Sequence, residues 1–268
     1  MLLIRKKILM FIIILIIPTV LFSQDGKVLN KILKSGELRV GTSGSQPPFT
    51  MKSKDGQLMG YEVELAKLLT DAMNLKLKFV EKPFSELLQA LEKGEVDVVM
   101  SGMTITPERN LKATFVGPYI ISGKSILAKS KRLSALDEMS EINRPTIKVV
   151  ALDGSTSQRF VEKLAPKVKL VTTKDYETAV NMVLEDEVDI MVADYPICVL
   201  SMLRHPDAGL ATLETPLTIE PIGLALPTNA FQLHNLVENY LNGLLLGGIL
   251  QNLEIKWFED SSWLIRLP

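Results

Sequence analysis

A group of hydroxyl-bearing residues followed by an arginine is the part of this sequence best suited to chemistry. Ser101 and Thr104 follow the apolar run 96–100, and Arg109 comes five residues after Thr104. Pro107 suits the first position of a helix. Hydroxyls, backbone N–H groups near a helix start and a planar guanidinium together favour the binding of a carboxylate. The same residues are also typical of an ordinary turn after a strand.

Alternating strand and helix patterns must position this group. The runs 38–42, 75–80 and 96–100 are typical of buried strands, whereas 61–73 and 84–91 carry apolar residues on one helical face. This alternation predicts a parallel α/β sheet, and such sheets bind ligands at the carboxyl ends of their strands.

A second, smaller α/β unit follows in the sequence. Strands are predicted at 147–151, 169–172 and 188–193, and helices at 156–164 and 176–185. The two units therefore repeat the same kind of architecture.

Two extended apolar stretches connect these units. The first lies at 118–124 and the second at 220–227, and helices are predicted afterwards at 231–246 and 250–258. Two α/β lobes with two connectors predict a hinge, with the ligand where the strand ends converge.

The N-terminus is typical of a secretory signal peptide. Basic residues at 5–7 precede an apolar run at 8–17, which is shorter than the ~20 residues of a membrane span. We expect cleavage after Ser23 and a periplasmic protein. An uncleaved anchor is the alternative.

Composition argues against several other classes of function. Without residues 1–23, 27 basic side chains face 31 acidic ones, a net charge of −4 that does not favour nucleic acid. Cys198 is the only cysteine, so no disulfide and no cysteine metal cluster is expected. His205 and His234 are isolated in the sequence. We therefore expect no cofactor and no metal.

The motif Ser-Gly-Met-Thr-Ile-Thr-Pro-Glu-Arg at 101–109 resembles the signature of the family 3 extracellular solute-binding proteins, the polar amino-acid receptors of ABC importers. The resemblance covers about 37–258. Further matching stretches occur in the family's order at 60–65, 94–97, 152–156 and 188–194.

This resemblance implies an α/β fold of the type II periplasmic binding protein class, a two-lobed clamshell with two hinge strands. The expected partners are an amino acid or related organic acid and an ABC transporter permease, and the protein is expected to be a monomer. The implied limits are a signal peptide at 1–23, lobe 1 at 24–118 plus 224–268, lobe 2 at 124–217, and hinges at 119–123 and 218–223.

The resemblance also implies a clamp for a zwitterion. Arg109 is expected to bind the α-carboxylate bidentately, with an exposed helix-start arginine as the alternative. Asp194 is expected to bind the α-ammonium, with a helix N-cap as the alternative. Because a buried charge needs a partner, the pair together implies a ligand with both charges.

Hydroxyl and backbone groups are expected around this clamp. Ser101, Gly102 and Thr104 would contribute them from lobe 1, and Ser155 and Thr156 would offer N–H donors at a helix start in lobe 2. Simple capping of that helix is the alternative for the last two residues.

The walls of the expected site depart from the family pattern. Phe84 matches an aromatic ring that packs on the ligand, with a core residue as the alternative. Gln46 stands where many relatives have an aromatic residue, and Ser43 where many binders of basic amino acids have an acid. These departures favour a polar or smaller ligand side chain over lysine or arginine, although Leu152 opens a loop similar to that of the basic subgroup.

The stretches 30–40, 203–206 and 256–258 resemble a catalytic branch of the family, the periplasmic cyclohexadienyl dehydratases. In those enzymes a glutamate three residues after the strand-end Asp is the general acid, and Ile197 occupies that position here. Isoleucine cannot donate a proton, which removes a contribution of ~10²–10⁴ in rate. Lys124 matches a lysine of their site, or is a charge at the hinge edge. We expect a non-catalytic binding protein, with the dehydratase as the alternative.

Overall fold

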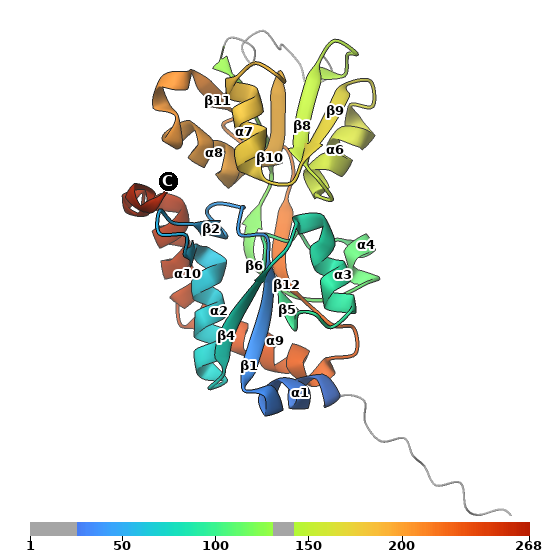
Figure 1. The fold of residues 1–268 in the computed structure, drawn as a ribbon, viewed down its shortest axis with the longest axis vertical. Coiled ribbons are helices and arrows are strands. Elements are labelled where there is room, and N and C mark those ends of the chain that lie inside the picture. The colour runs from blue at the N-terminus through green and yellow to red at the C-terminus, as the bar shows by residue number, and fades with distance from the viewer. Residues whose placement is uncertain (1–25, 131–141) are drawn as a thin grey trace, which may run out of the picture.

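The computed structural model describes residues 26–130 and 142–268. Two five-stranded sheets, each flanked by helices, form two lobes that lie one above the other along the long axis (Figure 1). The expected signal peptide at 1–23 lies outside the described residues. Among those residues, no helix is both long and apolar enough to cross a membrane.

Lobe 1 is built on the sheet with strand order β4-β1-β5-β12-β6. Strands β4 and β5 pair in parallel with β1, whereas β12 pairs antiparallel with both β5 and β6. Its strands are β1 (Glu37–Thr42), β4 (Lys76–Glu81), β5 (Val98–Val99), β6 (Thr114–Ser122) and β12 (Glu220–Leu226), with a separate hairpin of β2 (Met51–Lys52) and β3 (Leu58–Met59). Its helices are α1 (Lys27–Ser35), α2 (Tyr61–Ala72), η1 (Phe84–Glu86), α3 (Leu87–Glu92), α4 (Pro107–Asn110), α9 (Phe231–Leu246), α10 (Ile249–Glu254), η4 (Ile255–Glu259) and η5 (Ser262–Arg266).

Local sequence determines where helices of lobe 1 begin and end. Helix α1 ends at Gly36, whose φ of 69° is left-handed and whose N–H bonds the carbonyls of Ile32 and Leu33. Helix α4 begins where the Thr106 hydroxyl accepts the backbone N–H of Arg109, with a proline in its first turn. This cap places the arginine on the last turn of a very short helix at the edge of the sheet.

Lobe 2 is built on the sheet with strand order β11-β7-β10-β8-β9. Strand β8 pairs in parallel with β9 and β10, and β7 pairs antiparallel with β10 and β11. Its strands are β7 (Lys124–Lys129), β8 (Lys148–Leu152), β9 (Lys169–Thr173), β10 (Ile190–Asp194) and β11 (Leu210–Thr212). Its helices are α6 (Thr156–Leu164), α7 (Tyr176–Leu184), α8 (Tyr195–Arg204) and η3 (Pro206–Ala208).

Both sheets are mixed, which corrects the expectation of a parallel sheet. The alternating units do give parallel strands, but the connecting strands β7 and β12 run antiparallel to their neighbours. They do so because each continues a chain that has just crossed from the other lobe, with no helical crossover before it. Helix α8 and strand β11 were not expected from the sequence pattern.

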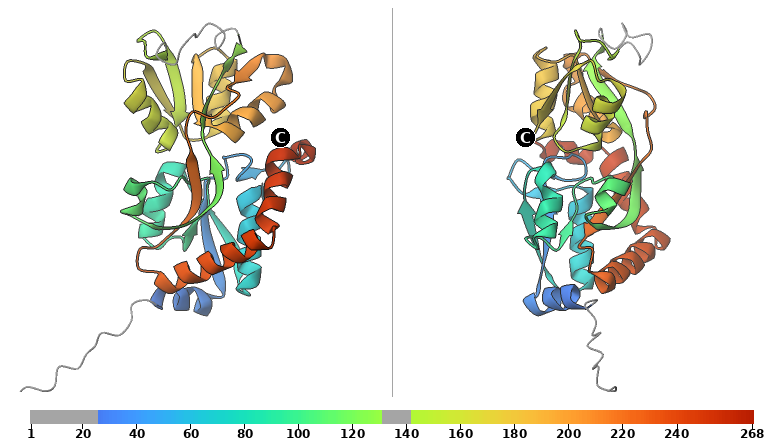
Figure 2. Two further views of the ribbon diagram at one scale, coloured as in Figure 1. Left: turned by 180° about the vertical axis from the view of Figure 1, so that it is seen from behind. Right: turned by 90° about the vertical axis from the view of Figure 1, so that its right-hand side faces the viewer.

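The chain crosses between the lobes at two neighbouring places, Gly123 and the segment 213–219. Views from behind and from the side show the connecting strands next to each other (Figure 2). A Cβ atom on Gly123 would lie 2.1 Å from the carbonyl oxygen of Thr218 and 2.5 Å from the Cβ of Pro216. Only glycine therefore fits where the two connectors touch. The lobe and hinge limits expected from the sequence stay predictions.

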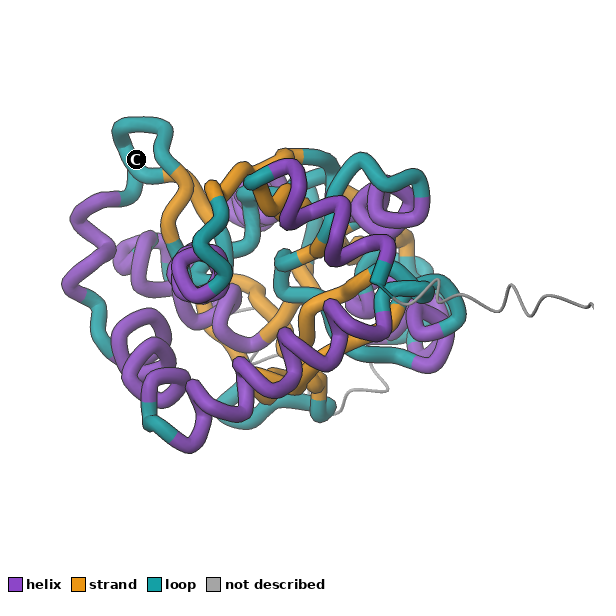
Figure 3. Tube along the Cα trace, turned by 90° about the horizontal axis from the view of Figure 1, so that it is seen from below, coloured by secondary structure: helices purple, strands orange, loops and turns teal. Residues whose placement is uncertain are grey.

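Apolar packing continues from one lobe into the other. One core cluster lies in lobe 1 apart from Leu200 of lobe 2, and helices surround the strands when the molecule is viewed from below (Figure 3). Another cluster joins Leu87 and Met103 of lobe 1 to Leu152 and Tyr176 of lobe 2. Since these side chains are buried together, the lobes are in contact in this conformation.

Candidate functional site

The Arg109 side chain lies where the two lobes meet. It is 4% exposed. Its Nη1 donates to the Thr104 carbonyl in lobe 1 at 2.9 Å, and its Nη2 donates to the Gly154 carbonyl in lobe 2 at 3.3 Å. The guanidinium carbon lies 5.4 Å from the centroid of the Phe84 ring, a cation–π distance. Phe84 also belongs to the buried apolar cluster that joins the lobes, and its expected packing on a ligand stays a prediction.

The electrostatic surroundings of Arg109 favour an anionic ligand. Burial, followed by the positive charge of Arg159, lowers the pKa of Arg109 to about 10, whereas Asp194 and Glu220 act in the opposite direction. Its hydrogen bonds go to neutral carbonyls, and the described part of the chain gives it no ion pair. A buried cation in this state gains from a carboxylate that supplies the missing charge.

Hydroxyl groups of the 101–104 loop face both lobes. The Thr104 hydroxyl lies 3.3 Å from that of Thr156 in lobe 2, across the lobe junction. The Ser101 hydroxyl accepts the backbone N–H of Ser43 at 3.0 Å and donates to the Ser43 hydroxyl at 3.1 Å. Gly102 has a left-handed φ of 58°, and a Cβ there would lie 2.6 Å from the Oε1 of Gln46. The buried Gln46 side chain therefore packs directly against the loop.

Asp194 ends β10 in lobe 2, opposite Lys124 of the antiparallel strand β7. It stands at the N-cap position of α8, but its side chain makes no capping bond. Its Oδ1 instead lies 2.5 Å from the Nζ of Lys124, which is 1% exposed and also lies 3.6 Å from Glu220. Its side chain therefore does not cap α8, and its carboxylate belongs to a group of three charges with the buried Lys124 and the partly buried Glu220.

The start of helix α6 has a structural role as well as a place in the junction. The Ser155 hydroxyl accepts the Gln158 N–H at 3.1 Å and donates to the Leu152 carbonyl at 2.6 Å, which is a helix cap. Leu152 is fully buried in the apolar core. Thr156 faces Thr104. The structure thus brings Thr156 to the junction, while the hydroxyl of Ser155 serves as the cap.

A model of the bacterial extracellular solute-binding proteins, family 3, matches residues 38–260. The chain belongs to this family. It is 25% identical over 232 residues to a cyclohexadienyl dehydratase of Pseudomonas aeruginosa, and the match covers 86% of each sequence. The family includes that enzyme beside many binding proteins, so membership alone does not decide whether the chain is a catalyst.

Two solved structures also show the solute-binding protein fold. One is an ancestral amino acid-binding protein, a precursor of cyclohexadienyl dehydratase, with a TM-score of 0.80, 34% identity, and coverage of 86% of this chain and 99% of that one. The other is a binding component of an ABC transporter from Wolinella succinogenes complexed with lysine, with a TM-score of 0.82, 33% identity and the same coverage. The expected family and the two-lobed clamshell are thereby confirmed.

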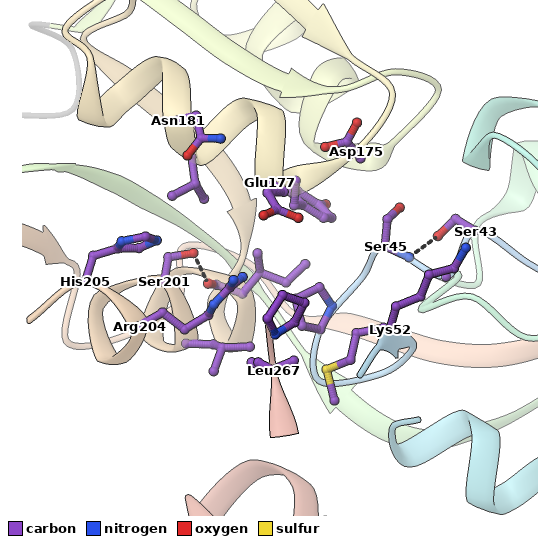
Figure 4. A pocket seen from close by; sticks show the side chains of 18 of the residues that line it. Ser43, Ser45, Lys52, Asp175, Glu177, Asn181, Ser201, Arg204, His205 and Leu267 are labelled. Atoms are coloured by element: carbon purple, nitrogen blue, oxygen red, sulfur yellow. Dashed lines mark hydrogen bonds between the residues drawn. The ribbon is translucent and has the colours of Figure 1, made fainter. Parts of the chain in front are cut away.

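Between the lobes of this family 3 protein lies a cavity of about 310 Å³, here called the interlobe cavity. Side chains of α7 and α8 approach it from lobe 2, opposite Ser43, Ser45 and Lys52 of lobe 1 (Figure 4). None of the eleven expected binding residues lines it. It begins next to them, however, because Ser43 is hydrogen-bonded to Ser101.

Two residues at the lobe junction, Tyr176 and Glu220, were not predicted from the sequence. Tyr176 is buried, lines the interlobe cavity and opens α7 directly after Asp175, whose side chain caps that helix. Burial, followed by the charge of Asp194, raises the pKa of Tyr176 well above its usual range. The available signals were an aromatic residue at a capped helix start and an acid at the beginning of an apolar connector.

Proposed function

We propose that this chain is a periplasmic receptor that binds an amino acid between its two lobes and delivers it to an ABC importer. The observation that carries the proposal is the placement of Arg109 on lobe 1 and Asp194 on lobe 2, both buried. The negative charges of Asp194 and Glu220 raise the pKa of Arg109, so the two ends of the clamp lie within electrostatic range of each other.

The balance of buried charges supports a zwitterionic ligand. Lys124, Asp194 and Glu220 together carry one positive and two negative formal charges, which leaves one negative charge for a ligand ammonium. Arg109 carries one positive charge for a ligand carboxylate. A ligand with one charge of each sign therefore matches both ends, whereas an anion or a cation alone would leave one end without a partner.

The interlobe cavity supports a polar ligand side chain. Its lining includes the acids Glu81, Asp175 and Glu177 beside the bases Lys52 and Arg204. A ligand side chain that extends past Ser43 would meet these charged groups. The Wolinella relative binds lysine, but the acid that many basic-amino-acid binders carry at position 43 is a serine here, so we assign a polar amino acid rather than a basic one.

Calorimetry with the twenty amino acids tests this function, together with the variants Arg109→Met and Arg159→Met. Arg159 is a matched control because it is an arginine near the same junction whose side chain is half exposed. Loss of one partner of a desolvated charge pair costs about 2–5 kcal/mol, or at least about thirtyfold in affinity. We expect that loss for Arg109→Met and less than threefold for Arg159→Met. Near wild-type affinity in folded Arg109→Met would refute the clamp.

The similarity to the Pseudomonas aeruginosa dehydratase makes the enzyme the second candidate. Ile197 occupies the position at which the similar enzymes carry their general acid. It is buried among apolar side chains and forms part of the wall of the interlobe cavity. We expect the purified protein to form no phenylpyruvate from prephenate and no phenylalanine from arogenate. Robust turnover would overturn the assignment as a non-catalytic receptor.

A further inference from the structure

A fully buried carboxylate lies beneath the 101–104 loop. Glu62 of α2 is 0% exposed, and its Oε1 and Oε2 accept the backbone N–H of Gly102 at 2.8 and 3.0 Å. The hydroxyl of Tyr119 donates to the same Oε1 in a short hydrogen bond. One side chain therefore holds a loop of the candidate site and a residue of β6 at the same time.

Tyr119 lies on the strand that leads into the first crossing between the lobes, four residues before Gly123. Its ring stacks on that of Tyr61, with centroids 5.7 Å apart and planes 21° apart. The Tyr61 hydroxyl also donates to the Tyr119 carbonyl at 3.3 Å. A shift of the Tyr119 side chain is therefore passed to the backbone of β6 rather than absorbed by a loose rotamer.

The 101–104 loop and the residue that follows it are attached to the second crossing strand by backbone hydrogen bonds. The N–H of Ile105 donates to the Pro221 carbonyl at 2.7 Å, and the N–H of Gly223 donates to the Met103 carbonyl at 3.1 Å. Both residues of β12 lie next to the crossing at 213–219. The loop is thus joined to β12 through its backbone and to β6 through Glu62.

We propose that Glu62 is a positioning residue that couples occupation of the 101–104 loop to movement of the hinge. A ligand that orders the loop fixes the Gly102 N–H, which fixes the carboxylate, and the carboxylate holds Tyr119 and with it β6. Hydrogen bonds in a dry interior of low dielectric constant are strong enough to transmit such a preference between two lobe arrangements. This inference rests on the proposed function, because it concerns the same ligand site.

The variant Tyr119→Phe tests the coupling, because it keeps the ring and the Gly102 bond but removes the hydroxyl link to Glu62. Tyr240→Phe is the matched control, since the Tyr240 hydroxyl donates to the Leu68 carbonyl at 2.8 Å in the same lobe and away from the loop. Calorimetry measures affinity for the amino acids that the wild type binds, and small-angle scattering measures the ligand-induced change in radius of gyration. We expect about tenfold weaker binding and a smaller change for Tyr119→Phe, and wild-type values within twofold for Tyr240→Phe.

Hydrogen exchange of the unliganded protein provides a readout that does not need a ligand. In Tyr119→Phe and in Glu62→Gln, the amides of the loop and of β6 should exchange faster together, and in Tyr240→Phe neither segment should change. If the wild type binds no amino acid, the proposed function fails, and the exchange data still decide on the coupling. Wild-type affinity, wild-type closure, or faster exchange in only one of the two segments would overturn the coupling.

Discussion

Removal of the Lys124 ammonium should strongly destabilise the folded protein. The substitution Lys124→Met keeps most of the side-chain length and removes the positive charge. Asp194 loses a contact of 2.5 Å and Glu220 one of 3.6 Å, and the Lys124 and Asp194 side chains are only 1% and 9% exposed. The buried Asp194 carboxylate and the partly buried Glu220 carboxylate then lose the cation that both contact. Breaking a buried pair in this way costs about 3–5 kcal/mol of unfolding free energy.

Strand β7 also offers a matched control for this substitution. Lys129 lies on the same strand and makes an ion pair of the same 2.5 Å length with Asp186, but these side chains are 30% and 54% exposed. Water screens that pair, so Lys129→Met should cost at most about 1 kcal/mol. The two variants therefore differ in burial while sharing residue type, strand and distance.

Urea unfolding of the wild type and the two variants, followed by circular dichroism, measures both free energies. We expect Lys124→Met to lose several times more unfolding free energy than Lys129→Met, with similar m-values for all three proteins. Equal losses for the two lysines would show that the group of three charges does not have the energetics inferred from its geometry.

Two further outcomes concern pH and the hinge. Burial raises the pKa of Glu62 from 4.5 to about 7, so its contribution to stability is fully present below pH 4.5 and is lost as the pH rises through about 7. The free energy of unfolding, measured at a series of pH values, should show this loss in the wild type. The same dependence of that free energy on pH in Glu62→Gln would contradict it. Gly123→Ala should destabilise the protein, because its Cβ would lie 2.1 Å from the Thr218 oxygen. Gly243 lies in the interior of α9, and a Cβ atom there would have no neighbour within 4 Å. Gly243→Ala should therefore stabilise the protein by about 0.5–1 kcal/mol. A higher thermal midpoint for Gly123→Ala than for Gly243→Ala would argue against the tight crossing.

Local patterns in the sequence were sufficient for much of the fold. Helices α6 (Thr156–Leu164) and α9 (Phe231–Leu246) have the bounds that the apolar periodicity indicated. The cap by Ser155 and the proline-led start of α4 follow from residue chemistry within one turn. The pair Asp55 and Gly56, typical of a hairpin turn, lies between β2 and β3, which pair antiparallel.

The contacts that define the candidate site were not available from local patterns. Lys124 meets Asp194 because β7 and β10 pair antiparallel across 70 residues of sequence. Glu62 reaches Gly102 and Tyr119, which are 40 and 57 residues away. No periodicity within one element indicates such partners, because they depend on how the crossing strands join the two sheets.

We propose that the two lobes together bind the charged ends of an amino acid. The measurement that tests this most directly is calorimetry with each amino acid that binds, with its N-acetyl derivative and with its α-carboxamide. The N-acetyl derivative lacks the ammonium expected at Asp194, and the carboxamide lacks the carboxylate expected at Arg109. We expect each derivative to bind at least about thirtyfold more weakly than the free amino acid. Equal affinity for the free amino acid and for either derivative would contradict it.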